Sequence, residues 1–512
     1  MSQGVRMSDQ GASKAIVIGA GLGGLAAGVR LAARGYNVDV FEKLDGPGGR
    51  AYVYRQDGFT FDAGPTIVTA PFLLEELWEL AGRKFSDDVD LRPIDPYYTI
   101  RFHDGQTFEY SGDHEHMRRE IAKFSADDFA GYERFLEASA ELYRVGFDQL
   151  LYASFDTLWS MVRTIPDLIR TQFYRSVYGM VSRYVKHPRL RMIFSFHPLL
   201  IGGNPMTTTA VYALIAHLER SHGVHYAMGG TNQIVAGMVT LIERLGGRVH
   251  LSSPVKQVLV ENGRAAGVEL ESGIEHRADV VVSNADSAST YRYLVPEQHR
   301  SRWTDRRLKK SRFSMSLFVW YFGTRKQYGD VPHHMILLGP RYQGLLADIF
   351  DHKTLADDFS LYLHRPTATD PTMAPPGCDA FYVLSPVPNQ VSGIDWETAA
   401  EPYRQAIAAS LEATVLPGLT DNLMTSHLLT PNDFQDRLSS VEGAAFSFEP
   451  VLWQTAWFRP HNRSEELPGL YLVGGGTHPG AGMPGVISSA KVLDTVVPDP
   501  AHSGASLATA TS

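Results

Sequence analysis

The chain has 512 residues, of which 44% are hydrophobic and 20% charged, and its formal net charge is −9 at pH 7. This length is too great for one ordinary core and predicts two or three domains. The acidic balance does not suggest a nucleic-acid-binding protein, and the sequence shows no basic-aromatic stripe of the kind that RNA- or DNA-binding proteins need. The single cysteine, Cys378, excludes an intrachain disulfide and favours a reducing compartment.

The first predicted element is a buried parallel strand over residues 15–18, followed by a glycine-rich turn and an alanine-rich helix. Gly19, Gly21 and Gly24 have the G-x-G-x-x-G spacing. Gly19 allows a tight turn, Gly21 lets a pyrophosphate approach the backbone, and Gly24 lets the helix pack on the strand. The free N–H groups at the helix start attract phosphate. This stretch predicts a dinucleotide-binding site.

A second strand, residues 37–41, ends in Glu42, which follows Gly24 by 18 residues. A carboxylate at this place binds ribose hydroxyls and repels a 2′-phosphate. Lys43 follows directly and joins the predicted cofactor-binding set. Further along, Val255 is predicted to begin a strand, and we expect its backbone N–H and C=O to face an adenine.

A Gly-Gly-Arg sequence, formed by Gly48, Gly49 and Arg50, lies in the next loop. It is typical of flavoproteins rather than NAD dehydrogenases, and Arg50 can neutralise pyrophosphate charge. A plain surface loop that ends in a solvated arginine is the alternative. Residues 59–66 then predict a strand and a tight turn.

The predicted secondary structure changes along the middle of the chain. Residues 71–82 predict a helix, and residues 89–110 predict two extended segments around a turn. From about 126 to 218 helices dominate, which indicates an insertion. Within it, residues 175–203 interleave basic residues with aromatic ones, including Phe194 and Phe196. This pattern suits docking on an anionic membrane interface, and an ordinary amphipathic core helix is the alternative.

The second half of the chain predicts a return to the dinucleotide domain from His225, and then a sheet. The runs 315–322, 359–364 and 381–386 are strongly β-prone, and we expect them to wall a cavity. Near the end, residues 469–491 predict a strand, a glycine cluster and a helix start. Two glycine-rich elements at opposite ends of one chain predict one cofactor held from both sides.

Residues 469–489 resemble the bacterial phytoene desaturase signature position by position, with a core of GGGTHPGAGM over residues 474–483. Further similar segments run in order along the chain: RAYVY at Arg50, FDAGPT at Phe61, RSVY at Arg175, LLIGGNP at Leu199, DFSLYLH at Asp358, LSPVP at Leu384 and WFRPHN at Trp457. The resemblance covers residues 15 to about 492. It implies FAD, a monoamine-oxidase-like fold, and stepwise dehydrogenation of phytoene to neurosporene or lycopene.

The resemblance also implies roles for individual residues. The glycine motif and Glu42 would hold the ADP part of FAD, and the Gly-Gly-Arg loop would lie along the pyrophosphate. Residues bordering the isoalloxazine would be Gly64, Pro65, Thr66, Gly485, Val486 and Ile487, and Gly475 would also bind the cofactor.

The fold class expected is α/β, with a Rossmann-type FAD-binding domain, a discontinuous β-sheet substrate domain and a helical membrane-associating insertion. The FAD-binding domain is predicted to comprise 14–90, 222–295 and 441–498. The other predicted ranges are 91–125 and 296–440 for the substrate domain, 126–221 for the insertion, and 1–13 and 499–512 for disordered tails.

The chemistry needs a base but does not identify it. Phytoene is a hydrocarbon, so recognition requires an apolar channel. Flavin accepts a hydride, and a base or water takes the neighbouring proton. His478 is a candidate base, with a hydrogen-bonding role in its loop as the alternative. Arg163 is a candidate catalytic residue at the flavin site, with a surface position as the alternative. No metal site is expected, because the pair His333 and His334 offers too few ligands.

The expected partners follow from a lipid-dissolved substrate. We expect a protein of the cytoplasm, peripheral on the inner face of the cell membrane, with oxygen or a quinone as electron acceptor. No apolar run is long enough to span a bilayer, and the stretch from residue 15 is too rich in glycine and arginine for a signal segment.

Alternative functions remain open at this point. One group comprises other carotenoid flavoenzymes, namely a hydroxy- or methoxyneurosporene desaturase, an isomerase or a ketolase. Another is a non-catalytic prenyl-lipid-binding protein on the same fold. An NAD-dependent dehydrogenase is disfavoured by the Gly-Gly-Arg and carboxy-terminal motifs.

Overall fold

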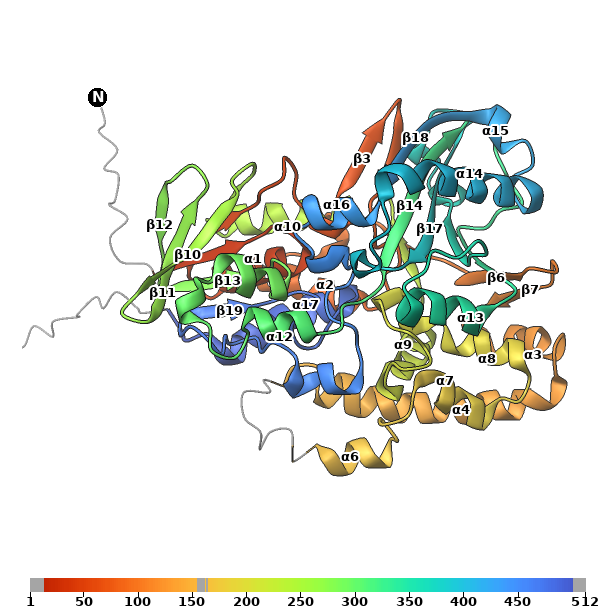
Figure 1. The fold of residues 1–512 in the computed structure, drawn as a ribbon, viewed down its shortest axis with the longest axis horizontal. Coiled ribbons are helices and arrows are strands. Elements are labelled where there is room, and N and C mark those ends of the chain that lie inside the picture. Colours follow the sequence, from red (N-terminus) through yellow and green to blue (C-terminus); the bar gives the residue numbers. More distant parts are fainter. Residues whose placement is uncertain (1–12, 154–161, 163, 501–512) are drawn as a thin grey trace, which may run out of the picture.

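The structure is a computed structural model that describes residues 13–153, 162 and 164–500. The predicted tails therefore lie almost wholly outside the described residues, and so does Arg163. Two sheets divide the molecule, one on the left and one on the right of Figure 1, and a group of helices lies below the right-hand sheet.

The first sheet is parallel, with strand order β19-β13-β1-β2-β9 in the described part of the chain. Its strands are β1 (Lys14–Ile18), β2 (Asn37–Phe41), β9 (Arg248–His250), β13 (Val280–Ser283) and β19 (Leu470–Leu472). They come from three separate stretches of sequence, which lie within the three ranges predicted for the cofactor domain. The first two strands were predicted correctly from their apolar runs.

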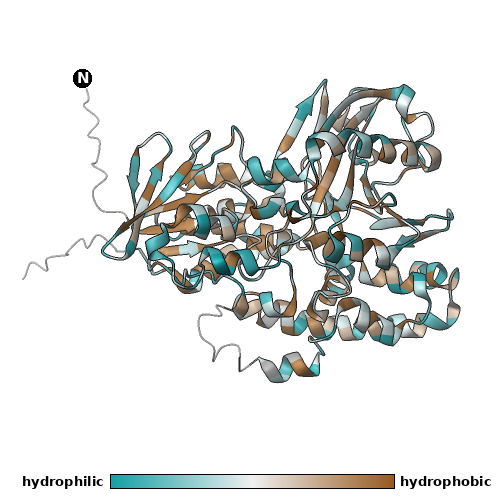
Figure 2. Cartoon of the chain, in the orientation of Figure 1, coloured by the Kyte–Doolittle hydropathy of each residue, from teal (hydrophilic) through white to brown (hydrophobic). Residues whose placement is uncertain are grey.

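Both faces of this sheet are covered, as a parallel sheet requires. Ala15 and Val17 of β1 point into a core shared with α1 (Leu22–Ala33), α10 (Asn232–Arg244) and α17 (Met483–Val496). Ile16 and Ile18 point the other way, into a core shared with β10 (Val255–Glu261) and β11 (Arg264–Leu270), which form a separate antiparallel sheet with β12 (Glu275–Arg277). Figure 2 shows the apolar character of these central strands.

The second sheet has the order β18-β14-β17-β16-β15-β6-β7. Its strands are β6 (Tyr98–Phe102), β7 (Thr107–Tyr110), β14 (Ser316–Thr324), β15 (His334–Leu338), β16 (Leu361–His364), β17 (Asp379–Val387) and β18 (Leu423–Leu429). The three β-prone runs form β14, β16 and β17, which lie side by side. This confirms the predicted sheet.

Alternation along β14 gives the second sheet two different faces. Phe318, Trp320 and Phe322 are buried in a core with α14 (Trp396–Thr414) on the outer face. Leu317 and Val319 point to the opposite face, where they line a cavity. The predicted role of this sheet as a cavity wall is therefore confirmed.

The helical region contains α3 (His114–Ala122), α4 (Phe129–Tyr143), α6 (Ile165–Arg170), α7 (Val177–Tyr184), α8 (Pro188–Ser195) and α9 (Leu214–His222). The remaining elements with regular structure are α2 (Pro71–Leu80), β3 (Val53–Gln56), β4 (Phe59–Asp62), β5 (Leu91–Pro93), β8 (His225–Ala227), α11 (Ser287–Ser289), α12 (Asp305–Lys310), α13 (Tyr342–Ala347), α15 (Leu419–Asn422) and α16 (Pro431–Asp436). Among the described residues, no helix is both long and apolar enough to cross a bilayer.

The prediction of an exposed aromatic patch over residues 175–203 is wrong. Phe194 and Phe196 are 1% and 3% exposed, and their rings pack against Tyr132 and Tyr98. Several basic residues of this segment make contacts within the protein; Arg189, for example, forms an ion pair with the Asp104 carboxylate. The alternative, an amphipathic helical segment with an apolar side in the core, is the observed arrangement.

Candidate functional site

A cavity of about 1200 Å³ lies between the two sheets and the helical region. At one end it is lined by the loop after β2 and by the start of β10. At the other it is lined by apolar side chains of the second sheet and of residues 196–201. A cavity that is polar at one end and apolar at the other suits a nucleotide cofactor beside a hydrocarbon.

The first glycine-rich turn has the geometry that the spacing predicts. Gly19 has a φ of 91°, and its N–H donates to the carbonyl of Phe41 at 2.8 Å. A Cβ on Gly24 would lie 2.0 Å from the carbonyl oxygen of Gly19. Only glycine at position 24 therefore allows α1 to approach the turn this closely. Gly24 itself is absent from the cavity wall, so its role is packing.

The loops that carry Gly21 and Gly48 meet in a parallel bridge, and both glycines line the cavity. Gly49 lies beside them, and a Cβ there would be 3.4 Å from the Cα of Gly21. This part of the wall therefore presents backbone without side chains, as a pyrophosphate needs. The residues present fit a dinucleotide.

Glu42 lies at the end of β2, where its carboxylate lines the cavity. Its Oε2 accepts from the N–H of Ala20 at 2.7 Å, and its Oε1 accepts from the N–H of Leu44 at 2.9 Å. These bonds fix the carboxylate in the place predicted for a ribose acceptor. Val255 also lines this end, although no contact of its backbone tests the predicted adenine role.

Lys43 points across the cavity mouth rather than into solvent. Its ammonium donates to the Ser439 hydroxyl at 2.7 Å and to the Asp436 carbonyl at 3.1 Å. Burial lowers the pKa of Lys43. The side chain thus ties the loop after α16 to the loop after β2.

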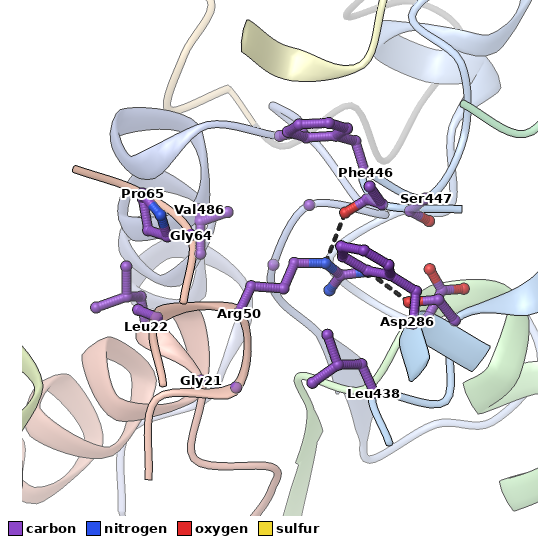
Figure 3. Close-up of a pocket in the computed structure, with 18 of the residues that line it drawn as sticks. Gly21, Leu22, Arg50, Gly64, Pro65, Asp286, Leu438, Phe446, Ser447 and Val486 are labelled. Atoms are coloured by element: carbon purple, nitrogen blue, oxygen red, sulfur yellow. Dashed lines mark hydrogen bonds between the residues drawn. The ribbon is translucent and has the colours of Figure 1, made fainter. Parts of the chain in front are cut away.

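Arg50 extends from the Gly-Gly-Arg loop toward Asp286 and the 445–447 segment (Figure 3). Its Nε donates to the Ala445 carbonyl and its Nη2 to the Ser440 hydroxyl, both at 2.7 Å. Burial raises the pKa of Asp286, and the Arg50 charge opposes that rise. Arg50 therefore joins the two sides of the cavity, and its pyrophosphate contact stays a prediction.

Asn284, at the end of β13, is a central residue that sequence reasoning missed. A Cβ on Gly21 would lie 2.8 Å from its Nδ2, and a Cβ on Gly474 would lie 2.9 Å from its Oδ1. The amide thus fills the space between the two glycine-rich loops. A polar residue at the carboxyl end of a parallel strand is the signal that could have found it.

Most of the residues predicted to bind near the flavin ring lie on the cavity wall. Residues that line the cavity are Gly64, Pro65, Thr66, Gly475, Gly485 and Val486. Ile487 is an exception, because its side chain is 2% exposed and lies in the core with α1 and α10. Successive side chains on α17 point in different directions, so Val486 faces the cavity while Ile487 faces the core.

His478 does not line the cavity, which removes it as a candidate base. Its Nε2–H donates to the carbonyl of Leu150 at 2.9 Å, and burial lowers its pKa to about 4. The bond ties the carboxy-terminal glycine loop to the helical region. The hydrogen-bonding alternative for His478 is therefore the arrangement observed.

Glu219 on α9 is a carboxylate on the cavity wall beside Phe196 and Leu218. It is 1% exposed, accepts from the Tyr98 hydroxyl at 2.7 Å and lies 3.1 Å from Nε2 of His197. Tyr98 is 121 residues from Glu219 along the chain, so no local sequence motif indicates this cluster.

Together, a parallel dinucleotide sheet, glycine loops on both sides of one cavity, and an apolar wall define a flavin-dependent oxidoreductase. The chain belongs to the flavin containing amine oxidoreductase family, whose model matches residues 22–492. Within this family it groups with the bacterial phytoene desaturases, on the similarities that follow. Its cofactor is therefore a flavin.

Phytoene desaturase (neurosporene-forming) of Cereibacter sphaeroides is 50% identical over 493 residues, which cover 95% of this chain and 95% of the relative. Phytoene desaturase (lycopene-forming) of a Paracoccus species is 47% identical over 487 residues, which cover 95% of this chain and 97% of the relative. Among solved structures, a putrescine oxidase variant has a TM-score of 0.64 at 14% identity, over 95% of this chain and 99% of that chain. That last similarity concerns the fold alone.

Proposed function

We propose that this chain is an FAD-dependent phytoene desaturase that introduces double bonds stepwise, toward neurosporene or lycopene. The observation that carries the proposal is the single cavity described above, with a nucleotide end bounded by Glu42 and an apolar end bounded by β14, β16 and β17. The near-equal similarity to neurosporene-forming and lycopene-forming relatives supports either product.

The proposed role of each residue follows from its place in the cavity. FAD, when bound, supplies the acceptor for a hydride. The apolar side chains Leu317, Val319 and Leu338 exclude water and hold a hydrocarbon. A proton must also leave the carbon next to the hydride donor. We propose that the Glu219 carboxylate accepts this proton, since it is a buried base on the apolar part of the wall.

The polar end holds the cofactor by charge and backbone. We propose that Glu42 binds the ribose hydroxyls and that the backbones of Gly21 and Gly48 bind the pyrophosphate, since all three residues line the cavity. Arg50 keeps the two cavity walls together through Ala445 and Ser440. Oxygen or a membrane quinone is the proposed electron acceptor, because the sequence has no second nucleotide-binding fingerprint.

We also propose that the protein docks on the inner face of the cell membrane, through a surface other than the one expected from sequence. Of the segments that carry exposed apolar side chains, two are the candidates for this surface: Ile169 and Tyr174 in and after α6, at 56% and 55%, and Trp453, at 59% in the 452–458 segment. Both segments lie along the lower edge of the molecule in Figure 1, in yellow and blue. Exposed aromatic and aliphatic residues of this kind suit a bilayer interface.

The test is anaerobic incubation of the FAD-loaded protein with phytoene in liposomes. Bleaching of the flavin absorbance, together with new structured polyene bands, is the expected result, and product analysis gives the number of double bonds. Bound FAD with unbleached absorbance and intact phytoene would overturn the proposal. In that case a later carotene would be tried next, and then prenyl-lipid binding without turnover.

A further inference from the structure

Three histidines meet inside the second sheet, outside the cavity already described. His334 begins β15 and pairs across the sheet with His364, the last residue of β16, while His333 directly precedes β15. Their exposed fractions are 5% for His333 and 1% for each of the others. One ring nitrogen from each residue lies within 4.8 Å of the other two.

The hydrogen bonds of these histidines leave four of their ring nitrogens without a partner. Nδ1 of His333 bonds the Thr369 hydroxyl at 2.6 Å, and Nδ1 of His334 bonds the Tyr362 hydroxyl at 2.7 Å. Nε2 of both residues, and both nitrogens of His364, are buried without a partner. In metal sites, a ligating histidine is held in the same way, through a hydrogen bond from its other nitrogen.

Unpartnered buried nitrogens are costly, because each loses its water without a replacement. Imidazole nitrogens bind metal ions in the neutral form. Three nitrogens without a thiolate suit a first-row divalent ion such as Zn²⁺.

The surroundings are compatible with a cation. Tyr226 packs its ring 4.6 Å from that of His333, and its hydroxyl is buried without a partner. Burial raises the pKa of Tyr226, and the nearby carboxylates of Asp62 and Asp370 raise it further. Arg365, the cation nearest His333, is paired with Asp379 at 2.9 Å.

We propose that His333, His334 and His364 bind a divalent transition-metal ion, with Zn²⁺ as the ion to test. Around a tetrahedral zinc, ligand nitrogens are roughly 3.3 Å apart, so modest ring rotations from the observed spacing close the site. The pairing of β15 with β16 supplies the third ligand that the His333–His334 pair lacks in the sequence. The reason for expecting no metal therefore fails.

The site is connected to the cavity by hydrogen bonds. The Tyr362 hydroxyl, which bonds His334, also lies 3.0 Å from Oγ1 of Thr66, and Thr66 lines the cavity. An ion on His334 fixes its tautomer and so fixes the orientation of Tyr362. The ion thus stabilises the part of the wall beside the predicted flavin ring, and its binding does not depend on the identity of the substrate.

The deciding experiment uses the full-length holoprotein without a polyhistidine tag. The protein is stripped with a chelator, reloaded with Zn²⁺, desalted and analysed by inductively coupled plasma mass spectrometry. We expect about one zinc per chain, and zinc K-edge X-ray absorption showing three imidazole ligands. Zinc well below one per chain, or a spectrum without imidazole ligands, would overturn the proposal and leave a buried water as the occupant.

Variants locate the ion. His364→Ala should lose the zinc while retaining FAD, which reports that the chain is folded. The matched control is His116→Ala, because His116 forms the other possible cluster, with Glu109 and Glu120, among the residues that the structure describes. Zinc lost in the control and kept in His364→Ala would overturn the assignment. If His364→Ala does not fold, the absorption spectrum of the unaltered protein still decides.

Discussion

The Glu42 carboxylate accepts a hydrogen bond from the backbone N–H of Ala20 at 2.7 Å, and this bond joins the end of β2 to the glycine-rich turn after β1. The two elements that define the nucleotide end of the cavity are thus held together by one side chain. Glu42 is 5% exposed, so the charge is nearly desolvated and its hydrogen bonds are strong.

Glu42→Gln should weaken FAD binding roughly tenfold to a hundredfold, because a hydrogen bond to a charged group contributes about 1.5–3 kcal/mol. Titration of the apoprotein with FAD, followed by flavin fluorescence, measures this change. Glu79→Gln is the control, since Glu79 is an exposed carboxylate on α2. Equal affinities in the two variants would remove Glu42 from the ribose site.

Gly24→Ala should destabilise the fold by about 3 kcal/mol or more, because the new Cβ would lie 2.0 Å from the Gly19 carbonyl oxygen. We expect a lower thermal midpoint and loss of bound flavin. Gly329→Ala is the matched control, since a Cβ there meets nothing within 4 Å. A Gly24→Ala protein as stable as the control would show that α1 can move away from the turn.

The nucleotide-binding end of the cavity was predictable because the residues that form it lie close together in the sequence. Gly19, Gly24 and Glu42 act through a turn, a helix contact and a strand end that are close in sequence. Asn284 and Glu219 were missed, since each becomes meaningful only when strands and helices far apart in the chain are brought together. The direction in which Phe194 points was misjudged for a related reason. An amphipathic pattern locates the apolar side of a helix, but it does not say whether protein or lipid covers that side.

Glu219→Gln should slow flavin reduction by phytoene roughly 10²–10⁴-fold, the usual contribution of a general base. FAD content and phytoene binding should be unchanged, because the amide keeps the size of the side chain. Stopped-flow reduction under anaerobic conditions gives the rate, and Glu243→Gln, an exposed change on α10, is the control. A rate like that of the control would assign the proton to another acceptor.

Asp62 should make stability fall as the pH rises. Burial raises the pKa of Asp62 to about 7 from 3.8, so the folded state binds more protons than the unfolded state between these values. Stability is therefore lost as pH increases through that window, by on the order of 4 kcal/mol, and is level above it. Urea unfolding from pH 4 to pH 8 should show this slope, and it should be reduced in Asp62→Asn. Parallel curves for the two proteins would contradict the assignment.

Membrane docking provides the last prediction, and it separates the two candidate surfaces. The double variant Trp453→Ser with Ile169→Ser removes exposed apolar side chains, so it should lower partition onto anionic liposomes while FAD stays bound. Val391→Ser is the control, because Val391 is similarly exposed, at 61%, on another segment.

Phe194→Asp should behave differently, because it buries a charge in the core and should unfold the protein. Cosedimentation with liposomes and flavin content together distinguish these outcomes. Unchanged partition of the double variant would place the docking surface elsewhere, and a folded, flavin-bound Phe194→Asp protein that leaves the liposomes would restore the 175–203 segment as that surface.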